Sequence, residues 1–141
     1  MIVFSSRFSM RVIYAHTDMM GRAYYSRYFE YFEAARSHML RELGLPYAEI
    51  EKMGVFLPVI ESHCPYKNGA TFDDLLSIQS TIMDFPRSKI RIDYGVTKEV
   101  GDITVAEGYT VHTFVNSSGK VVRPPKAFVT ALRSKWQASH D

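Results

Sequence analysis

The chain has 141 residues and a formal net charge of +2, with 46% hydrophobic and 23% charged residues. This composition is close to the globular average and excludes a disordered chain and a fibrous repeat, and without a dense basic stretch we expect no nucleic-acid partner. The length predicts one domain over residues 1–141 with one hydrophobic core. No apolar run approaches the ~20 residues that span a bilayer, and the apolar start 1–4 is too short for a signal-peptide core, so we expect a cytoplasmic protein.

The first third of the chain predicts a strand followed by a long helix. Apolar and polar residues alternate over residues 8–14, which is typical of a half-buried strand that ends near Tyr14. After the loop 16–21, apolar residues recur at intervals of three and four and form one helical stripe: Tyr28, Phe32, Ala35 and Met39. Gly44 and Pro46 then predict the end of this helix.

The rest of the chain predicts mostly strands. Residues 47–53 indicate a short helical turn, and 56–66 indicate extended chain whose prolines are typical of an edge or irregular strand. Alternating patterns predict further strands at 76–82, 90–96 and 103–115, with turns at 84–88, 98–102 and 116–120. Residues 128–136 predict a final helix. The order strand, long helix, then consecutive antiparallel strands predicts an α+β domain with the helix packed across one face of a sheet, and the uncovered surfaces predict self-assembly.

Asp18 is the main candidate for chemistry. It precedes the helix beside Met19, Met20 and Gly21, where apolar surroundings would disfavour a charged carboxylate and the N–H groups of a helix start would favour it. Such a carboxylate can attack a carbonyl or activate water. The alternative is a simple helix cap, but the helical pattern begins about six residues later, farther than a cap reaches, and Gly21 would let the backbone approach a ligand closely.

Other nucleophiles and metal sites are less favoured by the sequence. The single cysteine, Cys64, excludes an internal disulfide and could be a catalytic thiol or a buried spectator. We favour the spectator, because His63 and Cys64 as strand neighbours point to opposite faces. The histidines show no metal-binding spacing and there is no G-x-S-x-G motif, so we expect neither a metal site nor a serine nucleophile.

The loop and helix also carry a family resemblance. The segments 14–28 (YAHTDMMGRAYYSRY) and 32–36 (FEAAR) resemble the signature of the 4-hydroxybenzoyl-CoA thioesterase family of hotdog-fold acyl-CoA thioesterases. Further segments look like the same family at the expected spacing: 41–47 (RELGLPY), 57–61 (LPVIE), 66–67 (YK) and 72–75 (FDDL). The resemblance therefore covers nearly the whole chain.

The resemblance implies a hotdog fold, in which an antiparallel five-stranded sheet wraps around one long central helix, and homodimers or dimers of dimers with active sites between subunits. It implies hydrolysis of an acyl-CoA to a carboxylic acid and free CoA, with no cofactor, since CoA is part of the substrate. Asp18 matches the catalytic carboxylate, as nucleophile or general base. Tyr25 matches the position whose backbone N–H polarises the thioester carbonyl, and Tyr14 and Gly21 match an active-site tyrosine and the loop glycine.

This sequence departs from the family pattern near the helix start. Tyr25 stands where many members have histidine, and Arg27 stands where they have asparagine, so the roles of those side chains do not carry over. A backbone N–H does not depend on the side chain. Gly69 stands where proline is common, and no chemistry is attached to that change.

Cations for the phosphates of CoA are expected in the turn after the third predicted strand. Arg87, Ser88 and Lys89 cluster there, in a region that the resemblance associates with CoA binding, and Arg123 and Lys126 are weaker candidates. Other functions stay open at this point. They are hydrolysis of a carrier-protein thioester, dehydration of a hydroxyacyl thioester, which would need histidine in place of Tyr25, and a non-catalytic acyl-thioester binding or assembly module.

Overall fold

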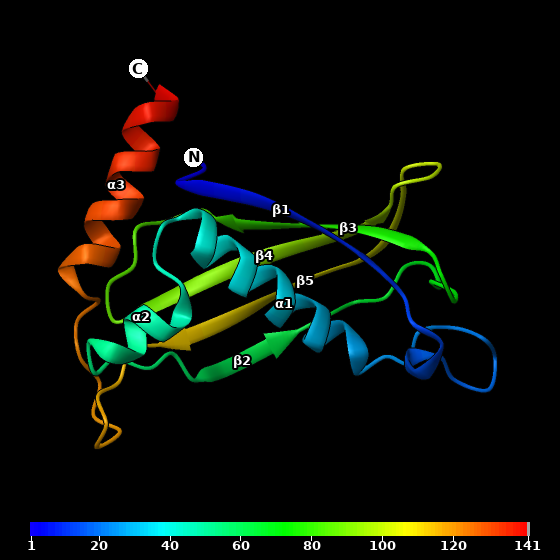
Figure 1. The fold of residues 1–141 in the computed structure, drawn as a ribbon, viewed down its shortest axis with the longest axis horizontal. Coiled ribbons are helices and arrows are strands. Elements are labelled where there is room, and N and C mark those ends of the chain that lie inside the picture. The colour runs from blue at the N-terminus through cyan, green and yellow to red at the C-terminus, as the bar shows by residue number, and fades with distance from the viewer. Residues whose placement is uncertain (141) are drawn as a thin grey trace.

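The computed structural model describes residues 1–140, which form a five-stranded antiparallel sheet curved around one long helix (Figure 1). The strands are β1 (Phe4–Arg11), β2 (Val59–His63), β3 (Leu75–Ile82), β4 (Lys89–Lys98) and β5 (Ile103–Thr113). They are ordered β1-β3-β4-β5-β2. The helices are α1 (Arg27–Glu42), α2 (Tyr47–Lys52) and α3 (Lys126–His140). This is the hotdog arrangement, so the α+β prediction is confirmed.

The core lies between α1 and the concave face of the sheet. Alternation along β4 buries every second side chain toward the helix: Ile90, Ile92, Tyr94 and Val96. The ring of Phe32 from α1 stacks on Tyr94 with centroids 4.3 Å apart. Gly108 of β5 lies beside the Phe32 ring, at a position where a Cβ atom would come within 2.3 Å of the His63 carbonyl oxygen. Only glycine fits there, because a real Cβ atom never approaches backbone so closely.

A series of hydrogen-bonded polar side chains crosses this core. Arg36 of α1 donates to the hydroxyl of Tyr94 (3.0 Å), which lies 2.8 Å from Thr110 Oγ1. Thr110 in turn lies 2.9 Å from His112 Nε2, and His112 Nδ1 is 3.0 Å from the carbonyl oxygen of Leu57. A carbonyl only accepts, so Nδ1 carries the proton and Nε2 accepts from Thr110. Burial lowers the pKa of His112 to about 4, so the imidazole is neutral at neutral pH.

The predicted elements are confirmed except at some ends. The first strand spans residues 4–11 rather than 8–14, because β1 pairs with β3 only from Phe4 to Arg11, and Tyr14 instead starts a short 3-10 turn. The predicted extended segment forms β2 at the sheet edge, with a register irregularity between Val59 and Glu61. The last strand ends at Thr113. Among the helices of residues 1–140, none combines the length and apolarity needed to cross a membrane.

Candidate active site

Asp18 lies in a tight turn of the segment that joins β1 to α1, and Figure 1 shows this segment at one end of the sheet. Thr17 and Ala23 pair across the turn, and the Asp18 N–H donates to the Arg22 carbonyl at 2.7 Å. The N–H of Gly21 returns to the Asp18 carbonyl at 3.0 Å with a φ of 76°, which glycine adopts without strain. The predicted loop glycine therefore shapes the turn that holds the carboxylate.

The carboxylate of Asp18 is oriented by its own turn. Its Oδ1 accepts from the N–H groups of Met20 (2.9 Å) and Arg22 (3.1 Å). Within residues 1–140 no protein group donates to Oδ2, which leaves this oxygen for a substrate or a water. Asp18 does not cap α1, whose N-cap residue is Ser26. The alternative of a simple helix cap is therefore wrong.

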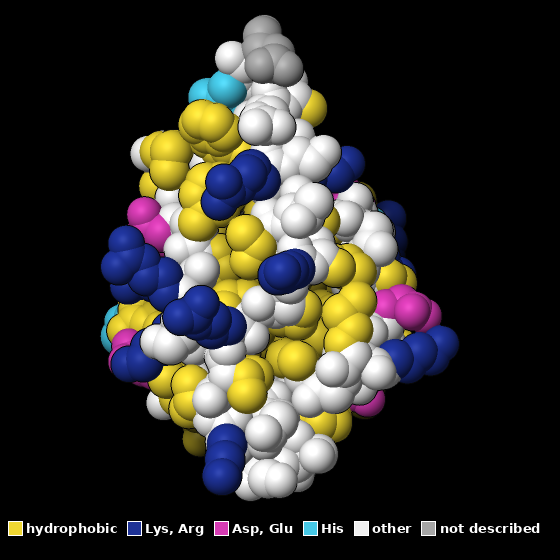
Figure 2. All heavy atoms as spheres, turned by 90° about the vertical axis from the view of Figure 1, so that its left-hand side faces the viewer, with side chains coloured by type: hydrophobic (Ala, Val, Ile, Leu, Met, Phe, Trp, Pro, Cys, Tyr) yellow, Lys and Arg dark blue, Asp and Glu magenta, His cyan; other side chains and the backbone are white. Residues whose placement is uncertain are grey.

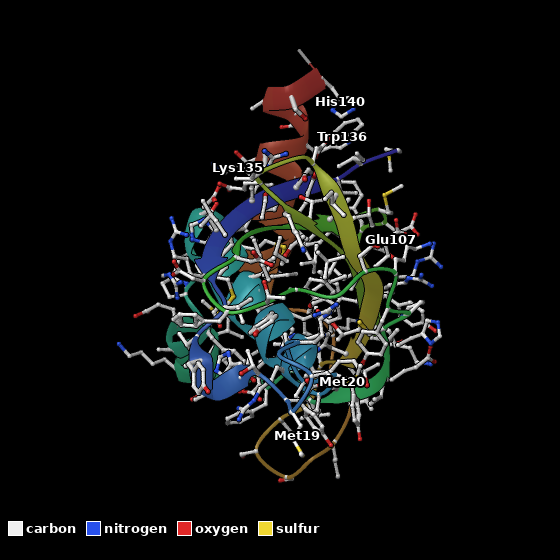
Figure 3. All side chains as sticks on the ribbon, turned by 90° about the vertical axis from the view of Figure 1, so that its right-hand side faces the viewer. Met19, Met20, Glu107, Lys135, Trp136 and His140 are labelled. Carbon is white, nitrogen blue, oxygen red and sulfur yellow. The ribbon has the colours of Figure 1, made fainter. Side chains whose placement is uncertain are left out.

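The surroundings of Asp18 differ from those expected. Met19 and Met20 lie at the tip of the loop, as Figure 3 shows, and are 105% and 80% exposed. They do not cover the carboxylate, which is itself exposed. In one chain the turn therefore fixes the direction of the carboxylate without burying it.

The start of α1 supplies unpaired N–H groups beside Asp18. The helix begins at Arg27, and the turn before it is closed by the Arg27 N–H, which donates to the Tyr24 carbonyl at 2.9 Å. The N–H of Tyr25 has no acceptor in the part of the chain that is described. Unpaired donors at a helix start stabilise negative charge on a ligand oxygen.

Asp18 and Tyr25 line the same pocket, which has a volume of about 330 Å³. The other lining residues are Ala23, Tyr24, Tyr28, Tyr66, Lys67, Asn68 and Gly69. Burial raises the pKa of Tyr28 to about 12, so its phenol stays protonated at neutral pH. The pocket thus combines a carboxylate and a backbone donor with walls that include four tyrosines.

Within one chain, the structure places Tyr14 outside this pocket and places Tyr66 on its wall. Tyr14 does not line the pocket: its side chain is 77% exposed and packs edge-on against Phe72. Tyr66 was assigned no role, yet it lines the pocket and its hydroxyl donates to the Tyr25 carbonyl at 3.0 Å. The only sequence signal for Tyr66 was its place in the family-like segment 66–67.

The predicted phosphate-binding residues lie at the opposite end of the sheet (Figure 1). Thr113 Oγ1 donates to the Ser88 carbonyl, whereas Tyr66 pairs with Ala106, and these two β5 positions are roughly 23 Å apart at about 3.3 Å per residue. Arg87 and Ser88 line a groove of about 580 Å³ together with Pro86, Val121, Val122, Arg123, Pro124 and Val129.

The structure thus brings Arg87 and Ser88 of the turn together with Arg123, one of the weaker candidates, in a single groove. Lys89 faces a neighbouring hollow that also contains Asp84 and Asp93, and Lys126 does not line the groove. Figure 2 shows this end of the molecule, where Lys and Arg side chains are spread over apolar surface. In a single chain, the Arg87 groove and Asp18 do not belong to one pocket.

Cys64 and His63 do not form a catalytic pair in the structure. Burial raises the pKa of Cys64 to about 11, which keeps the thiol protonated, and the exposed His63 ring packs beside Tyr109. This arrangement favours the spectator interpretation. Within residues 1–140, no three His, Cys, Asp or Glu side chains are grouped as metal ligands would be.

The fold and the site together define a hotdog protein that carries a carboxylate beside unpaired backbone donors. The model of the thioesterase-like superfamily matches residues 13–132, so the chain belongs to this superfamily. Its class of activity is thioester hydrolysis. The family resemblance of the sequence is thereby confirmed.

Individual relatives cover nearly all of the chain. A protein of Aquifex aeolicus, provisionally named an esterase, is 35% identical over 87% of this chain and 94% of its own length. A solved structure of a hypothetical protein from Thermus thermophilus is 32% identical, with a TM-score of 0.85 and coverage of 93% and 97% of the two chains. The DHNA-CoA thioesterase of Staphylococcus aureus is 25% identical, with a TM-score of 0.86 and coverage of 96% and 93%.

Proposed function

We propose that the protein hydrolyses acyl-CoA thioesters in the pocket between Asp18 and the start of α1. The observation that carries the proposal is the placement of the free Asp18 Oδ2 and the unpaired Tyr25 N–H on one pocket. The thioester carbonyl would accept from the Tyr25 N–H, and Asp18 would act on the carbonyl carbon or on a water beside it. The likeness to a CoA thioesterase of Staphylococcus aureus supports CoA as the carrier.

The geometry is compatible with two roles for Asp18. As a general base, its Oδ2 takes a proton from water while the water oxygen attacks the carbonyl carbon, and the oxyanion is stabilised by the Tyr25 N–H. Cleavage of the C–S bond then releases the CoA thiolate, which recovers the proton, and the carboxylic acid. As a nucleophile, Oδ2 attacks the carbon itself, CoA leaves, and water hydrolyses the resulting mixed anhydride.

We further propose that the phosphates of CoA bind in the Arg87 groove of a second copy. Within one chain the groove and Asp18 are at opposite ends of the sheet, whereas a partner running antiparallel would bring the two together. The exposed edge strand β2 supports such a partner, because all five of its residues are exposed and its free edge offers backbone groups for pairing. The assembly is therefore proposed as a homodimer or a dimer of dimers.

A substrate panel tests this function. Thiol release from acyl-CoAs of different chain length and from aromatic acyl-CoAs is followed with a thiol reagent, beside matched acyl-pantetheine and acyl-carrier-protein thioesters. Acyl-CoA thioesters should be hydrolysed with the highest kcat/KM. Preference for the carrier protein would replace CoA as the substrate, and binding of acyl-CoA without thiol release would show a non-catalytic module.

A further inference from the structure

One long-range hydrogen bond connects the pocket wall to the start of α1. The Tyr66 hydroxyl donates to the Tyr25 carbonyl at 3.0 Å across 41 positions of sequence. The Tyr66 ring also packs edge-on against Tyr28, with centroids 5.3 Å apart, and against Tyr25, with centroids 6.5 Å apart. Tyr66 therefore contacts the turn before the helix through both its ring and its hydroxyl.

Tyr66 stands on a rigid support. It pairs with Ala106 of β5, and the next two residues both donate their N–H groups to the Val105 carbonyl, Lys67 at 2.9 Å and Asn68 at 3.1 Å. Val105 and Ala106 are completely buried in the core. A buried strand holds the backbone of Tyr66. The Tyr66 hydroxyl therefore has a fixed position relative to the more exposed turn before α1.

The hydrogen bond holds a peptide group whose N–H is unpaired. A peptide is planar, so a contact that fixes its carbonyl also fixes the direction of the N–H on the other side. The peptide that carries the Tyr25 N–H is held through the Tyr24 carbonyl by Arg27. The next peptide carries the Ser26 N–H, which likewise has no acceptor within residues 1–140, and it is held through the Tyr25 carbonyl by Tyr66.

The Tyr66 phenol is suited to donate. Burial raises its pKa above the ordinary value, and the neighbouring Cys64 raises it further, so the hydroxyl keeps its proton at neutral pH. The Tyr28 N–H also reaches the Tyr25 carbonyl, but at the longer distance of 3.3 Å. Tyr66 is thus a contact from outside the helix that holds the peptide between Tyr25 and Ser26.

We propose that Tyr66 is a positioning residue: through the Tyr25 carbonyl it aligns the Ser26 N–H next to the Tyr25 N–H, so that both N–H groups stabilise the oxyanion of the thioester reaction. This inference rests on the proposed function. A preorganised donor pair stabilises charge that develops in the transition state more than it stabilises the bound substrate. Loss of the Tyr66 hydroxyl should therefore lower kcat rather than raise KM.

The variant Tyr66→Phe tests the role, because it removes the hydroxyl and keeps the ring that packs on Tyr28. We expect kcat to fall about tenfold with KM within about twofold, the scale of one lost hydrogen bond acting in the transition state. Tyr109→Phe is the matched control, since its hydroxyl binds Glu61 on the outer face of the sheet, away from the pocket. Unchanged kcat in Tyr66→Phe, or a loss confined to KM, would overturn the proposal.

Binding of two inert analogues gives a second readout that does not need turnover. One analogue carries an anionic tetrahedral phosphonate in place of the thioester carbonyl and mimics the oxyanion, and the other keeps a planar carbonyl with a methylene in place of sulfur. By calorimetry, Tyr66→Phe should weaken binding of the oxyanion mimic and leave binding of the planar analogue nearly unchanged, and wild-type affinity for the oxyanion mimic would contradict the inference. Failure of the proposed function is recognised separately, because wild-type protein would then hydrolyse no thioester of the panel.

Discussion

The two ends of the sheet carry different parts of the proposed chemistry. At the Asp18 end, a carboxylate and an unpaired N–H group line a small pocket with four tyrosines, and Lys67 is the one cationic residue among its described lining residues. At the Arg87 end, two arginines line a larger groove with mostly apolar walls and without a carboxylate among its described lining residues. The Asp18 end has groups suited to act on a carbonyl, and the Arg87 end has groups suited to bind phosphates. Neither end has both kinds of group.

In the proposed function, the residues for the reaction and the residues for phosphate binding lie at different ends of the sheet. A substrate with an acyl head and a phosphate tail needs both kinds of site, yet the curved sheet keeps them roughly 23 Å apart along β5 at about 3.3 Å per residue. Self-assembly joins them if the partner runs antiparallel, because the far end of one chain then lies beside the near end of the other. The following variants separate the contributions of the two ends.

The largest effect is expected for Asp18→Asn. The amide oxygen of asparagine can still accept from the Met20 and Arg22 N–H groups, so the turn should persist while the base or nucleophile is lost. We expect kcat for acyl-CoA hydrolysis to fall at least ~100-fold. Asp102→Asn, an exposed aspartate outside the pocket, is the matched control. Near-normal turnover by Asp18→Asn would remove Asp18 from the reaction.

A pH effect is expected from the core between the two ends. The pKa of His112 is lowered from 6.5 to about 4, so between these values the unfolded chain binds a proton that the folded chain does not. Stability is complete above pH 6.5, and the free energy of unfolding should fall by about 2 kcal/mol as the pH drops from 7.5 to 5. Urea unfolding at several pH values measures this fall.

The control for the pH effect is His63→Gln, which removes an exposed histidine and should leave the pH dependence unchanged. A flat unfolding free energy in wild-type protein over this range would contradict the assignment to His112. The measurement also supports the comparison of the two ends, since activity lost through acid unfolding is then distinguished from activity lost in the folded protein.

A smaller effect is expected at the Arg87 end. The double variant Arg87→Ala with Arg123→Ala should raise KM for acyl-CoA about tenfold and change kcat little, because phosphate contacts bind substrate and transition state alike. Acyl-pantetheine, which lacks the nucleotide phosphates, should be hydrolysed as by wild type. Lys135→Ala removes an exposed charge of α3 and serves as the control. An equal loss with both substrates would refute phosphate binding in this groove.

The smallest effect, about twofold, decides whether the two ends act across chains. A mixed dimer is isolated with two tags, one chain carrying Asp18→Asn and the other the Arg87 and Arg123 substitutions. If each site combines Asp18 of one chain with Arg87 of the other, one site is intact, and kcat/KM should be about half that of wild type. If both ends of one chain serve the same site, no site is intact and kcat/KM should fall to about a twentieth.

Local patterns predicted most of the fold. Alternation at 90–96 and the three-four spacing from Tyr28 to Met39 identified a strand and a helix that the structure confirms, because burial on one face imposes these periods. The predicted end of the first strand was wrong. Tyr14 continues the apolar alternation, but it lies beyond the last residue of β1 that pairs with β3. A pattern indicates which residues can be buried, whereas a strand ends where its partner turns away.

The sequence by itself determined the α+β class, through its periodicity, and Asp18 as the candidate carboxylate, through its place before the helix. The hotdog architecture and the superfamily followed from the family resemblance, which the contiguous segment 14–28 carries most clearly. The tertiary structure alone decided the surroundings of Asp18, the hydrogen bond from Tyr66 to Tyr25, and the separation of Arg87 from the pocket. The reason is that contacts between distant segments depend on strand register and on the direction in which each strand crosses the sheet, and these follow from the packing of the whole chain.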